Sequence, residues 1–428
     1  MSAQFLSSFA DNALLIVAIK LLSEMEAPTW MEPTLRSMFV ISYVLLAAFV
    51  AAFADSRPKG QVMFVTNIIK VVGLSLMLFT IHPLMAYAVV GLGAAAYSPA
   101  KYGILTELLP ANQLVVANAW IEGTTVGSII LGFAVGGWLY SPNMGAFLMS
   151  LHLPGAHTAA QAALWVILIF YLAASICNLQ IPDTGARYAP PRWDFISMAK
   201  SFSRSVYVLW HDKLGQISLA MTTLVWAAAA TLQLIVLRWA QEVLGLPDHK
   251  APMLLGVVAI GVAIGAIAAA RLIPLKKALS VSPLGVLMGA ACIVLAFYSK
   301  TWFPDDAYIG RMPLSIVVAM LFLVVVGGLA GFFIVPMNAL LQHRGYVRLS
   351  AGHSIAVQNF TENIGIVVML GFYALLLGMG LTIKTIIIIF GILMMILISL
   401  VMLWNRMNMK ERDWTQLIGE EKDPGLHK

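Results

Sequence analysis

Twelve apolar stretches, each about twenty residues long, follow one another along this chain of 428 residues. A helix rises about 1.5 Å per residue, so a helical run of this length spans the roughly 30 Å hydrocarbon core of a bilayer. Charged residues make up only 11% of the chain, whereas a soluble domain carries about 25%. The sequence therefore predicts an all-α integral membrane protein with twelve transmembrane helices.

The apolar runs indicate where these spans lie. We expect them at residues 2–22, 36–54, 61–81, 84–105, 115–138, 161–181, 216–239, 252–273, 283–299, 313–336, 353–378 and 382–404. The longest polar connection, at 183–215, divides them into an N-terminal six-helix bundle at 1–182 and a C-terminal one at 216–405. A polar tail follows at 406–428.

The connection between the bundles has a helical pattern of its own. Apolar residues recur at three- and four-residue spacing, opposite Lys200 and Arg204: Ile196, Ala199, Phe202, Val206 and Leu209. This spacing predicts an amphipathic helix. The pattern fits a helix lying on the inner leaflet and a simple tether equally well.

Lys and Arg are distributed unevenly between the two sides of the predicted membrane. Most of the 26 fall on the even-to-odd connections and on the tail. The positive-inside rule then places both termini of this multi-pass protein in the cytoplasm. The pI near 9.2 reflects this bias and does not indicate nucleic-acid binding, because no basic stripe with aromatic residues stands outside the spans.

The first span carries Asp11 and lacks a basic n-region, so we do not expect a cleaved signal peptide; a start upstream of Met1 stays open.

The sequence offers little that would support catalysis or a cofactor. Cys177 and Cys292 lie inside predicted spans, where we expect packed free thiols, and no metal-ligand spacing occurs. A lipid acyltransferase would need a motif such as a His followed five residues later by an Asp, and the loops contain none. We therefore expect no metal, no cofactor and no enzyme activity.

Several ionisable residues fall within the predicted spans. They are Asp11, Lys70, Lys101, Glu122, Arg238 and Glu362. Charges at bilayer depth are costly and usually line a polar pathway, which points to transport. Structural alternatives remain for three of them: Lys101 as an interface lysine, Lys70 as the partner of a structural carboxylate, and Arg238 as a snorkelling residue.

A weak internal repeat supports two related halves. The segment GAAAYSPAKYGIL aligns with GGLAGFFIVPMNALL so that Pro99 matches Pro336, and each is followed by a carboxylate within a span, Glu122 or Glu362. Parallel six-helix repeats around a central site are typical of one large transporter architecture. We predict two bundles related by a pseudo-twofold axis along the membrane normal.

Closely spaced glycines in the fifth span predict tight helix packing: Gly123, Gly127, Gly132, Gly136 and Gly137.

The connection at residues 51–61, AAFADSRPKGQ, resembles the loop signature of the major facilitator superfamily, Gly-x-x-x-Asp-Arg/Lys-x-Gly-Arg-Arg/Lys. Asp55 occupies the acidic position, while Ala51, Ser56, Pro58 and Gly60 depart from the pattern. The resemblance implies a gating role for Asp55, which pairs across helix ends in that family, and more weakly for Arg57. Taken alone, the loop also fits a basic turn that satisfies the positive-inside rule.

Five stretches resemble a narrower group, the bacterial lysophospholipid transporters of the same superfamily. They are AQFLSSFADNALL, GAAAYSPAKYGILTEL, LVVANAWIEG, GFFIVPMNALLQHRG and AVQNFTEN. The resemblance implies a flippase that moves lysophosphatidylethanolamine and related lysolipids from the outer to the inner leaflet by alternating access. It also implies a cytoplasmic acyltransferase/acyl-carrier-protein synthetase as the partner that re-acylates them. Two positions depart from the group: Ala10 replaces a Gly, and Gln233 stands where an Arg is usual, with Arg238 five residues later.

A lysolipid head needs a polar site with both charges, while its tail can stay in an apolar groove. Lys70 and Lys101 are our candidates for the phosphate, and Glu122, with Glu362 or Asp11, for an ethanolamine ammonium. The full set of substrate-binding candidates is Asp11, Asn12, Lys70, Lys101, Glu122, Gln233, Gln358, Asn359 and Glu362. The gating candidates are Asp55, Arg57 and Arg238.

The alternative function is a proton-coupled carrier or efflux pump for small amphiphiles, in which Asp11, Glu122 or Glu362 would carry the proton. The sequence leaves the head-group preference and the energy coupling open. We expect a monomer whose partners are the lysolipid and membrane lipids, with no nucleic acid.

Overall fold

The computed structural model describes residues 1–55, 57–108, 111–183, 194–304, 306–310, 312–348, 351–411 and 416. By its internal contacts the chain divides into two compact units. Unit 1 comprises Met1–Asp194 together with Leu246–Gly256, and unit 2 comprises Phe195–Gly245 and Val257–Lys428.

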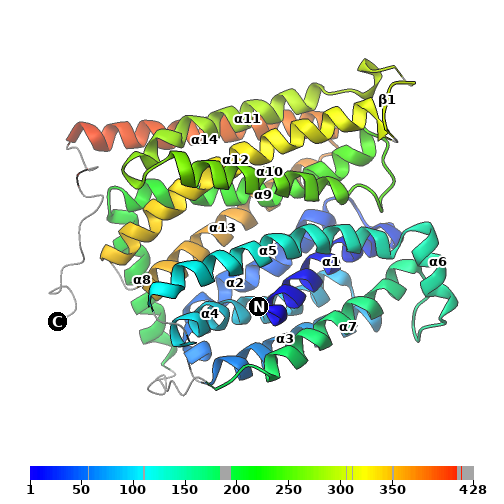
Figure 1. The fold of residues 1–428 in the computed structure, drawn as a ribbon, viewed down its shortest axis with the longest axis horizontal. Coiled ribbons are helices and arrows are strands. Elements are labelled where there is room, and N and C mark those ends of the chain that lie inside the picture. The colour runs from blue at the N-terminus through cyan, green and yellow to red at the C-terminus, as the bar shows by residue number, and fades with distance from the viewer. Residues whose placement is uncertain are drawn as a thin grey trace. The chain divides into compact units, whose positions relative to one another are not determined.

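Unit 1 is helical throughout its described part (Figure 1). Its helices are α1 (Ser2–Glu24), α2 (Met31–Asp55), α3 (Lys59–Leu78), α4 (Pro83–Leu108), α5 (Ala111–Leu139), α6 (Pro142–Ser150) and α7 (Ala159–Leu179). Helix α1 packs against α5 and α7, while α4 packs against α2 and α3.

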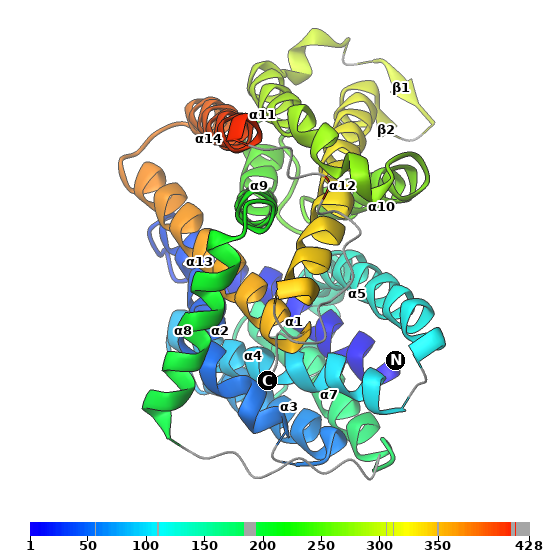
Figure 2. The same cartoon turned by 90° about the vertical axis from the view of Figure 1, so that its left-hand side faces the viewer.

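Unit 2 repeats this use of long helices (Figure 2). Its helices are α8 (Phe195–His211), α9 (Gly215–Glu242), α10 (Met253–Leu272), η1 (Leu275–Val281), α11 (Ser282–Phe297), η2 (Lys300–Trp302), α12 (Leu314–Arg348), α13 (Ala351–Gly378) and α14 (Ile383–Glu411). A two-residue hairpin, β1 (Tyr308–Ile309) and β2 (Met312–Pro313), precedes α12. Helix α9 contacts α12, α13 and α14.

The prediction of an all-α membrane protein is confirmed, and each of the twelve predicted spans falls on a helix. Within the described residues, ten helices are long and apolar enough to cross a membrane, and α5 with α6, bent by 68°, forms a further candidate. The predicted end of the tenth span at residue 336 is wrong, because α12 continues through Pro336 to Arg348. A membrane helix tolerates an internal proline when its neighbours satisfy the freed backbone group. Helix α6 was not expected; it is nine residues long and begins with a proline at its first turn.

Two of the five glycines in α5 let that helix approach α1 closely. A Cβ atom at Gly132 would lie 2.7 Å from the Phe9 carbonyl oxygen, and one at Gly136 would lie 2.9 Å from that of Ala13. Gly137 instead faces the segment after α9, at His249, and nothing lies within 4 Å of a Cβ at Gly127. The glycines thus hold α5 against the helix that carries Asp11.

Helix α8 packs its apolar side on the helices of unit 2. Leu209 is fully buried with residues of α9, α12 and α13, and the Phe202 ring lies edge-on to the Phe360 ring at 5.2 Å. Lys200, Arg204 and Tyr207 point outward. Of the apolar stripe that the sequence shows, Phe202, Val206 and Leu209 therefore contact protein, whereas Ile196 is 76% exposed.

Candidate functional site

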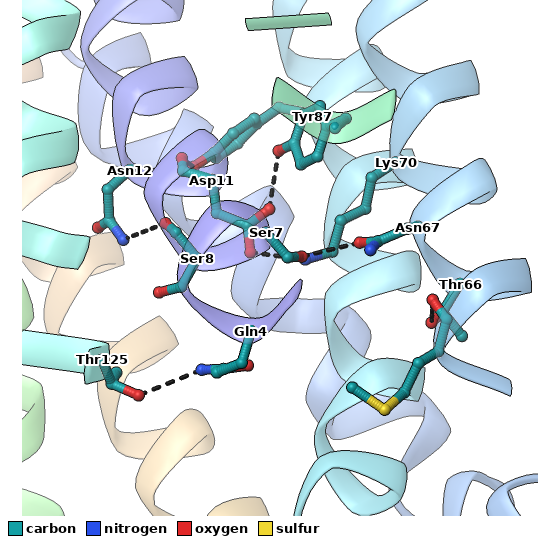
Figure 3. Close-up of polar contacts among 12 residues, drawn as sticks. Gln4, Ser7, Ser8, Asp11, Asn12, Thr66, Asn67, Lys70, Tyr87 and Thr125 are labelled. Carbon is teal, nitrogen blue, oxygen red and sulfur yellow. Dashed lines mark hydrogen bonds and ion pairs between the residues drawn. The ribbon is translucent and has the colours of Figure 1, made fainter. Parts of the chain in front are cut away.

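A buried ion pair lies among the apolar helices of unit 1. The Lys70 ammonium on α3 is 2.7 Å from the Asp11 carboxylate on α1 (Figure 3). The Lys70 side chain is only 2% exposed and that of Asp11 17%. The sequence placed these two residues in one candidate site, and the structure brings them into direct contact.

Both charged groups have further partners. The Tyr171 hydroxyl on α7 donates a hydrogen bond of 2.7 Å to the second Asp11 oxygen, and Lys70 donates one of 2.9 Å to the Ser7 hydroxyl. Ser7 in turn donates to the Asn67 side-chain oxygen at 2.8 Å. Helices α1, α3 and α7 therefore meet at one polar network.

The local sequence explains how the network assembles. Ser7 and Asp11 are four residues apart on α1, and Asn67 and Lys70 are three apart on α3, so each pair shares one helix face. The Lys70 stem passes over α4 at Gly93, where a Cβ atom would lie 2.7 Å from Lys70 Cγ. A larger residue at Gly93 would displace the lysine.

Aromatic rings enclose the same ammonium. Lys70 Nζ lies 5.1 Å from the centre of the Tyr97 ring and 5.9 Å from that of Tyr171. Ring faces attract a cation at these distances. The ammonium is thus held by one charge, one hydroxyl and two π systems.

Lys101 lies close to this network along α4. It is four residues after Tyr97, on the same helix face, and is 9% exposed. Asn12 uses its side-chain amide locally, donating a hydrogen bond of 2.8 Å to the Ser8 carbonyl. Lys101 therefore belongs to the neighbourhood of the ion pair, while Asn12 stabilises its own helix.

A second polar cluster lies in unit 2. Gln358 donates its side-chain amide to the Glu362 carboxylate at 2.8 Å and to the Asn338 oxygen on α12 at 3.1 Å. Gln358 and Glu362 are each 8% exposed. Asn338 stands two residues after Pro336, as Lys101 stands two after Pro99, so the predicted repeat places a polar residue in both units at this position.

Three other candidates in unit 2 lie apart from this cluster or make only local contacts. The Gln233 side-chain oxygen on α9 is buried and meets no hydrogen-bond donor among the described residues. Asn359 accepts a hydrogen bond from Asn363 through its backbone carbonyl at 2.7 Å. Arg238 pairs with Glu242, one turn later on α9, at 2.6 Å.

The remaining candidates cannot all be placed. The side chains of Asp55 and Glu122 lie outside what the structure describes, and Arg57 is exposed in the turn between α2 and α3. In the part of the chain that is described, no group of three His, Cys, Asp or Glu residues is arranged to hold a metal ion.

The sequence analysis missed a buried ion pair at the end of α12. Arg344, 2% exposed, contacts both oxygens of Asp212, at 3.0 and 2.6 Å, and the Gly215 backbone donates to the same carboxylate at 2.8 Å. Burial would raise the pKa of Asp212, but the hydrogen bonds and the charge of Arg344 outweigh it and hold the pKa below its ordinary value. Both residues lie just outside the apolar runs, where charged residues are common. Only their contact in the folded protein distinguishes them from the other charged residues there.

Comparisons with known proteins agree with this architecture. The family model of the Major Facilitator Superfamily matches residues 1–370. The lysophospholipid transporter LplT of Yersinia enterocolitica is 40% identical over 379 residues, which cover 88% of this chain and 86% of that protein. LplT of Photorhabdus laumondii is 38% identical over 405 residues, 94% of each chain.

Among solved structures, a bacterial homologue of the human lysosomal transporter Spinster, crystallised in an inward-facing, unoccupied conformation, aligns with a TM-score of 0.67. The alignment covers 96% of each chain at 14% identity, so this likeness concerns the fold alone. The two resemblances found in the sequence are confirmed: the chain belongs to the major facilitator superfamily and, within it, to the family of the bacterial lysophospholipid transporters.

Proposed function

We propose that this protein transports lysophospholipids, lysophosphatidylethanolamine among them, from the outer to the inner leaflet of the bacterial inner membrane. The single observation that carries the choice of cargo is its identity of 40% over 88% of the chain to a lysophospholipid transporter. The positive-inside rule supports cytoplasmic termini, and alternating access follows from membership of the superfamily.

The polar network in unit 1 suits the head group of such a lipid. A lysophosphatidylethanolamine head carries one phosphate and one ammonium, and Lys70 and Asp11 form a pair of the same two charges, 2.7 Å apart. The phosphate exchanges for the Asp11 carboxylate at Lys70, and the released carboxylate accepts the ammonium. Lys70 and Asp11 each keep an oppositely charged partner in this exchange, which limits the desolvation cost of opening a buried pair.

Other candidate residues complete this site in the proposal. Lys101, one turn from Tyr97, adds a second cation for the phosphate, and Glu122 adds a carboxylate for the ammonium. In unit 2, the candidates for contact with the head group are Gln358, Asn359, Glu362 and Gln233. Asp55, Arg57 and Arg238 act in gating.

Transport of this cargo requires no proton gradient. A lysolipid consumed by re-acylation at the inner leaflet already moves down its own gradient. A cytoplasmic acyltransferase/acyl-carrier-protein synthetase is the partner that removes the product.

The test uses spheroplasts that lack their own lysolipid transporter and express this protein. Labelled lysophosphatidylethanolamine should accumulate and be re-acylated, and initial uptake should continue when a protonophore dissipates the proton gradient. Glycerophosphoethanolamine, which has the head but no tail, should not compete. Failure to accumulate lysolipid would overturn the proposed cargo, whereas collapse with the protonophore at constant re-acylation would overturn only the coupling.

One observation favours the alternative of a proton-coupled carrier for small amphiphiles. Glu362 is 8% exposed, and its carboxylate has no Lys or Arg partner within ion-pairing distance among the described residues. A buried carboxylate whose partners are neutral groups, here the Gln358 amide and the Thr222 hydroxyl, is a group that can take up and release a proton. The protonophore experiment separates the two functions.

A further inference from the structure

A groove on the surface of unit 2 lies apart from both polar clusters. It has a volume of about 540 Å³ and runs between α11 and α14, which pack side by side (Figures 1 and 2). Small-molecule sites typically have volumes of about 300–1,000 Å³. Its lining consists of Pro283, Val286, Leu287 and Ala290 from α11 and Ser399, Met402, Leu403 and Arg406 from α14.

The lining residues form one stripe on each helix. On both helices they recur at three- and four-residue spacing over two turns, which is about 10 Å along the axis. Half of a hydrocarbon core is about 15 Å deep, so a groove of this length fits within one leaflet. Both helices are among the membrane-spanning candidates, and Leu287 and Leu403 are 51% and 54% exposed. The groove therefore opens toward lipid tails.

One end of the groove is cationic. Gly285 packs against Ile398 and Gly289 against Met395, so the two helices are antiparallel, and Arg406 lies at the end where α11 begins. At the same end, Met409 of α14 and Leu275 and Leu279 of η1 pack against one buried cluster, formed by Leu214, Ala278 and Leu340. The neighbouring lysines there are exposed: Lys276 and Lys277 on η1 and Lys410 on α14. No carboxylate lines the described groove.

We propose that this groove binds an anionic phospholipid of the surrounding bilayer, with an acyl chain along the α11–α14 stripe and the phosphate at Arg406. Basic pockets between membrane helices on the cytoplasmic side are suited to anionic head groups. The positive-inside rule places this end of α11 in the cytoplasm. A zwitterionic lipid fits less well, because its ammonium would meet Arg406 and the neighbouring lysines, and the described lining of the groove contains no carboxylate to accept it.

This lipid is distinct from the transported cargo. The groove residues lie on α11 and α14, whereas the polar cluster of unit 2 joins α12 and α13. The proposal therefore does not depend on which lipid the protein transports.

Native mass spectrometry of the purified full-length protein tests the proposal. Dioleoyl phosphatidylglycerol, dioleoyl phosphatidylethanolamine and lysophosphatidylethanolamine are added separately at equal concentration. Phosphatidylglycerol should bind preferentially, and Arg406→Gln should lower its retention about fivefold, the effect expected for one cation near an anionic lipid. Arg406→Lys should retain most of the binding, because it keeps the charge.

Two matched pairs of variants separate the groove from the rest of the surface. Ala290→Phe fills the groove and should displace the acyl chain, whereas Ala270→Phe, at an exposed alanine of α10, should not. Arg204→Gln, at an exposed arginine of α8, is the control for Arg406→Gln. Equal retention of phosphatidylglycerol by the Arg406→Gln and Arg204→Gln variants, or equal binding of the two dioleoyl lipids to the wild type, would overturn the proposal. If the Ala290→Phe protein is not monodisperse, the Arg406 variants decide alone.

Discussion

Among the described residues of unit 1, Lys70 is the least exposed charged residue, and its contacts suit both a stabilising role and the recognition proposed above. It is 2% exposed and contacts a carboxylate, a hydroxyl and two aromatic rings. A cation held in this way is costly to leave unpaired, because removing one partner of a buried pair typically costs about 3–5 kcal/mol. In the proposed exchange, a phosphate can replace Asp11 beside Lys70 at a low cost in free energy, because the phosphate supplies a negative charge when the Asp11 carboxylate moves away.

Asp11→Asn should therefore destabilise the protein strongly, and Asp11→Asn combined with Lys70→Met should recover most of the lost stability. Both variants should lose lysolipid transport. Thermal unfolding in detergent measures the first effect and lysolipid uptake the second. The control is Lys20→Met at the pair Lys20–Asp248, whose side chains are 27% and 47% exposed and whose loss should cost no more than about 1 kcal/mol. An Asp11→Asn protein as stable as the wild type would contradict this interpretation.

Lys101→Ala should impair transport far more than folding. A hydrogen bond to a charged group contributes about 1.5–3 kcal/mol, so the apparent affinity for lysolipid should fall about 10- to 100-fold. Lys101→Arg keeps the charge and should retain most of the activity. Uptake at several lysolipid concentrations, normalised to inserted protein, measures the change. Wild-type uptake by the alanine variant would remove Lys101 from the site.

At the scale of single residues, the sequence predicted which charged residues lie inside the membrane spans, but it predicted only some of the residues that contact them. Charges inside apolar runs identified Asp11 and Lys70, since position alone makes them costly. Tyr171 and Ser7 are ordinary residues of membrane helices, and only the packing of α7 and α1 shows that they bind the charged pair.

Among the elements, the connection from α8 to α9 is fixed to α12 by the Asp212–Arg344 pair. The sequence predicted a helix between the bundles from its apolar stripe. It did not predict which surface covers that stripe, because the same pattern fits a lipid leaflet and a protein groove. In the structure Phe202 and Leu209 pack on protein.

The Asp212–Arg344 pair should make stability depend on pH in the acid range. The pKa of Asp212 in the folded protein lies below its ordinary value of 3.8, so its contribution is complete above that pH and is lost as the pH falls through the lowered pKa. The melting temperature of the purified protein should therefore fall more steeply below about pH 4 than that of Asp212→Asn. The Asp212→Asn protein should also be less stable at neutral pH, because Arg344 loses its charge partner. Parallel acid profiles for the two proteins would show that Asp212 contributes no pH dependence.

The segment after α9 is a second connection with specific contacts. Within unit 1, Asp248 pairs with Lys20 of α1 at 3.0 Å, and its backbone carbonyl accepts a hydrogen bond of 3.2 Å from the Tyr140 hydroxyl after α5. This segment joins α9 to α10, so its release from α1 is a step that alternating access should require.

Cysteines at positions 20 and 248, joined by a short thiol-reactive cross-linker, should therefore stop transport. Each variant with only one of the two introduced cysteines, which also carries the native Cys177 and Cys292, should remain active after the same treatment. Uptake before and after cross-linking gives the comparison. Continued transport by the cross-linked protein would show that the segment moves together with α1 throughout the cycle.

For the whole molecule, the number and length of apolar runs were sufficient to predict the fold. All twelve expected spans are helical, because a helix of this length satisfies its backbone hydrogen bonds within a single segment, as lipid requires. The arrangement of the two bundles about a pseudo-twofold axis stays a prediction, as does a head-group site shared by both. The hydrophobic pattern of the sequence and the burial of its residues describe each unit by itself. The cargo is proposed from the similarity to known transporters and not from the composition of the chain.

The most direct test of the central proposal reconstitutes the purified protein in liposomes. Fluorescent lysophosphatidylethanolamine is placed in the outer leaflet, and the fraction protected from an external quencher is followed over time, with fluorescent diacyl phosphatidylethanolamine as the matched cargo. We predict that the lysolipid becomes protected rapidly, and that the diacyl lipid becomes protected no faster than in protein-free liposomes. With the Asp11→Asn/Lys70→Met variant, the lysolipid should also become protected no faster than in protein-free liposomes. Equal rates for both lipids, or a lysolipid rate no faster than in protein-free liposomes, would contradict the account.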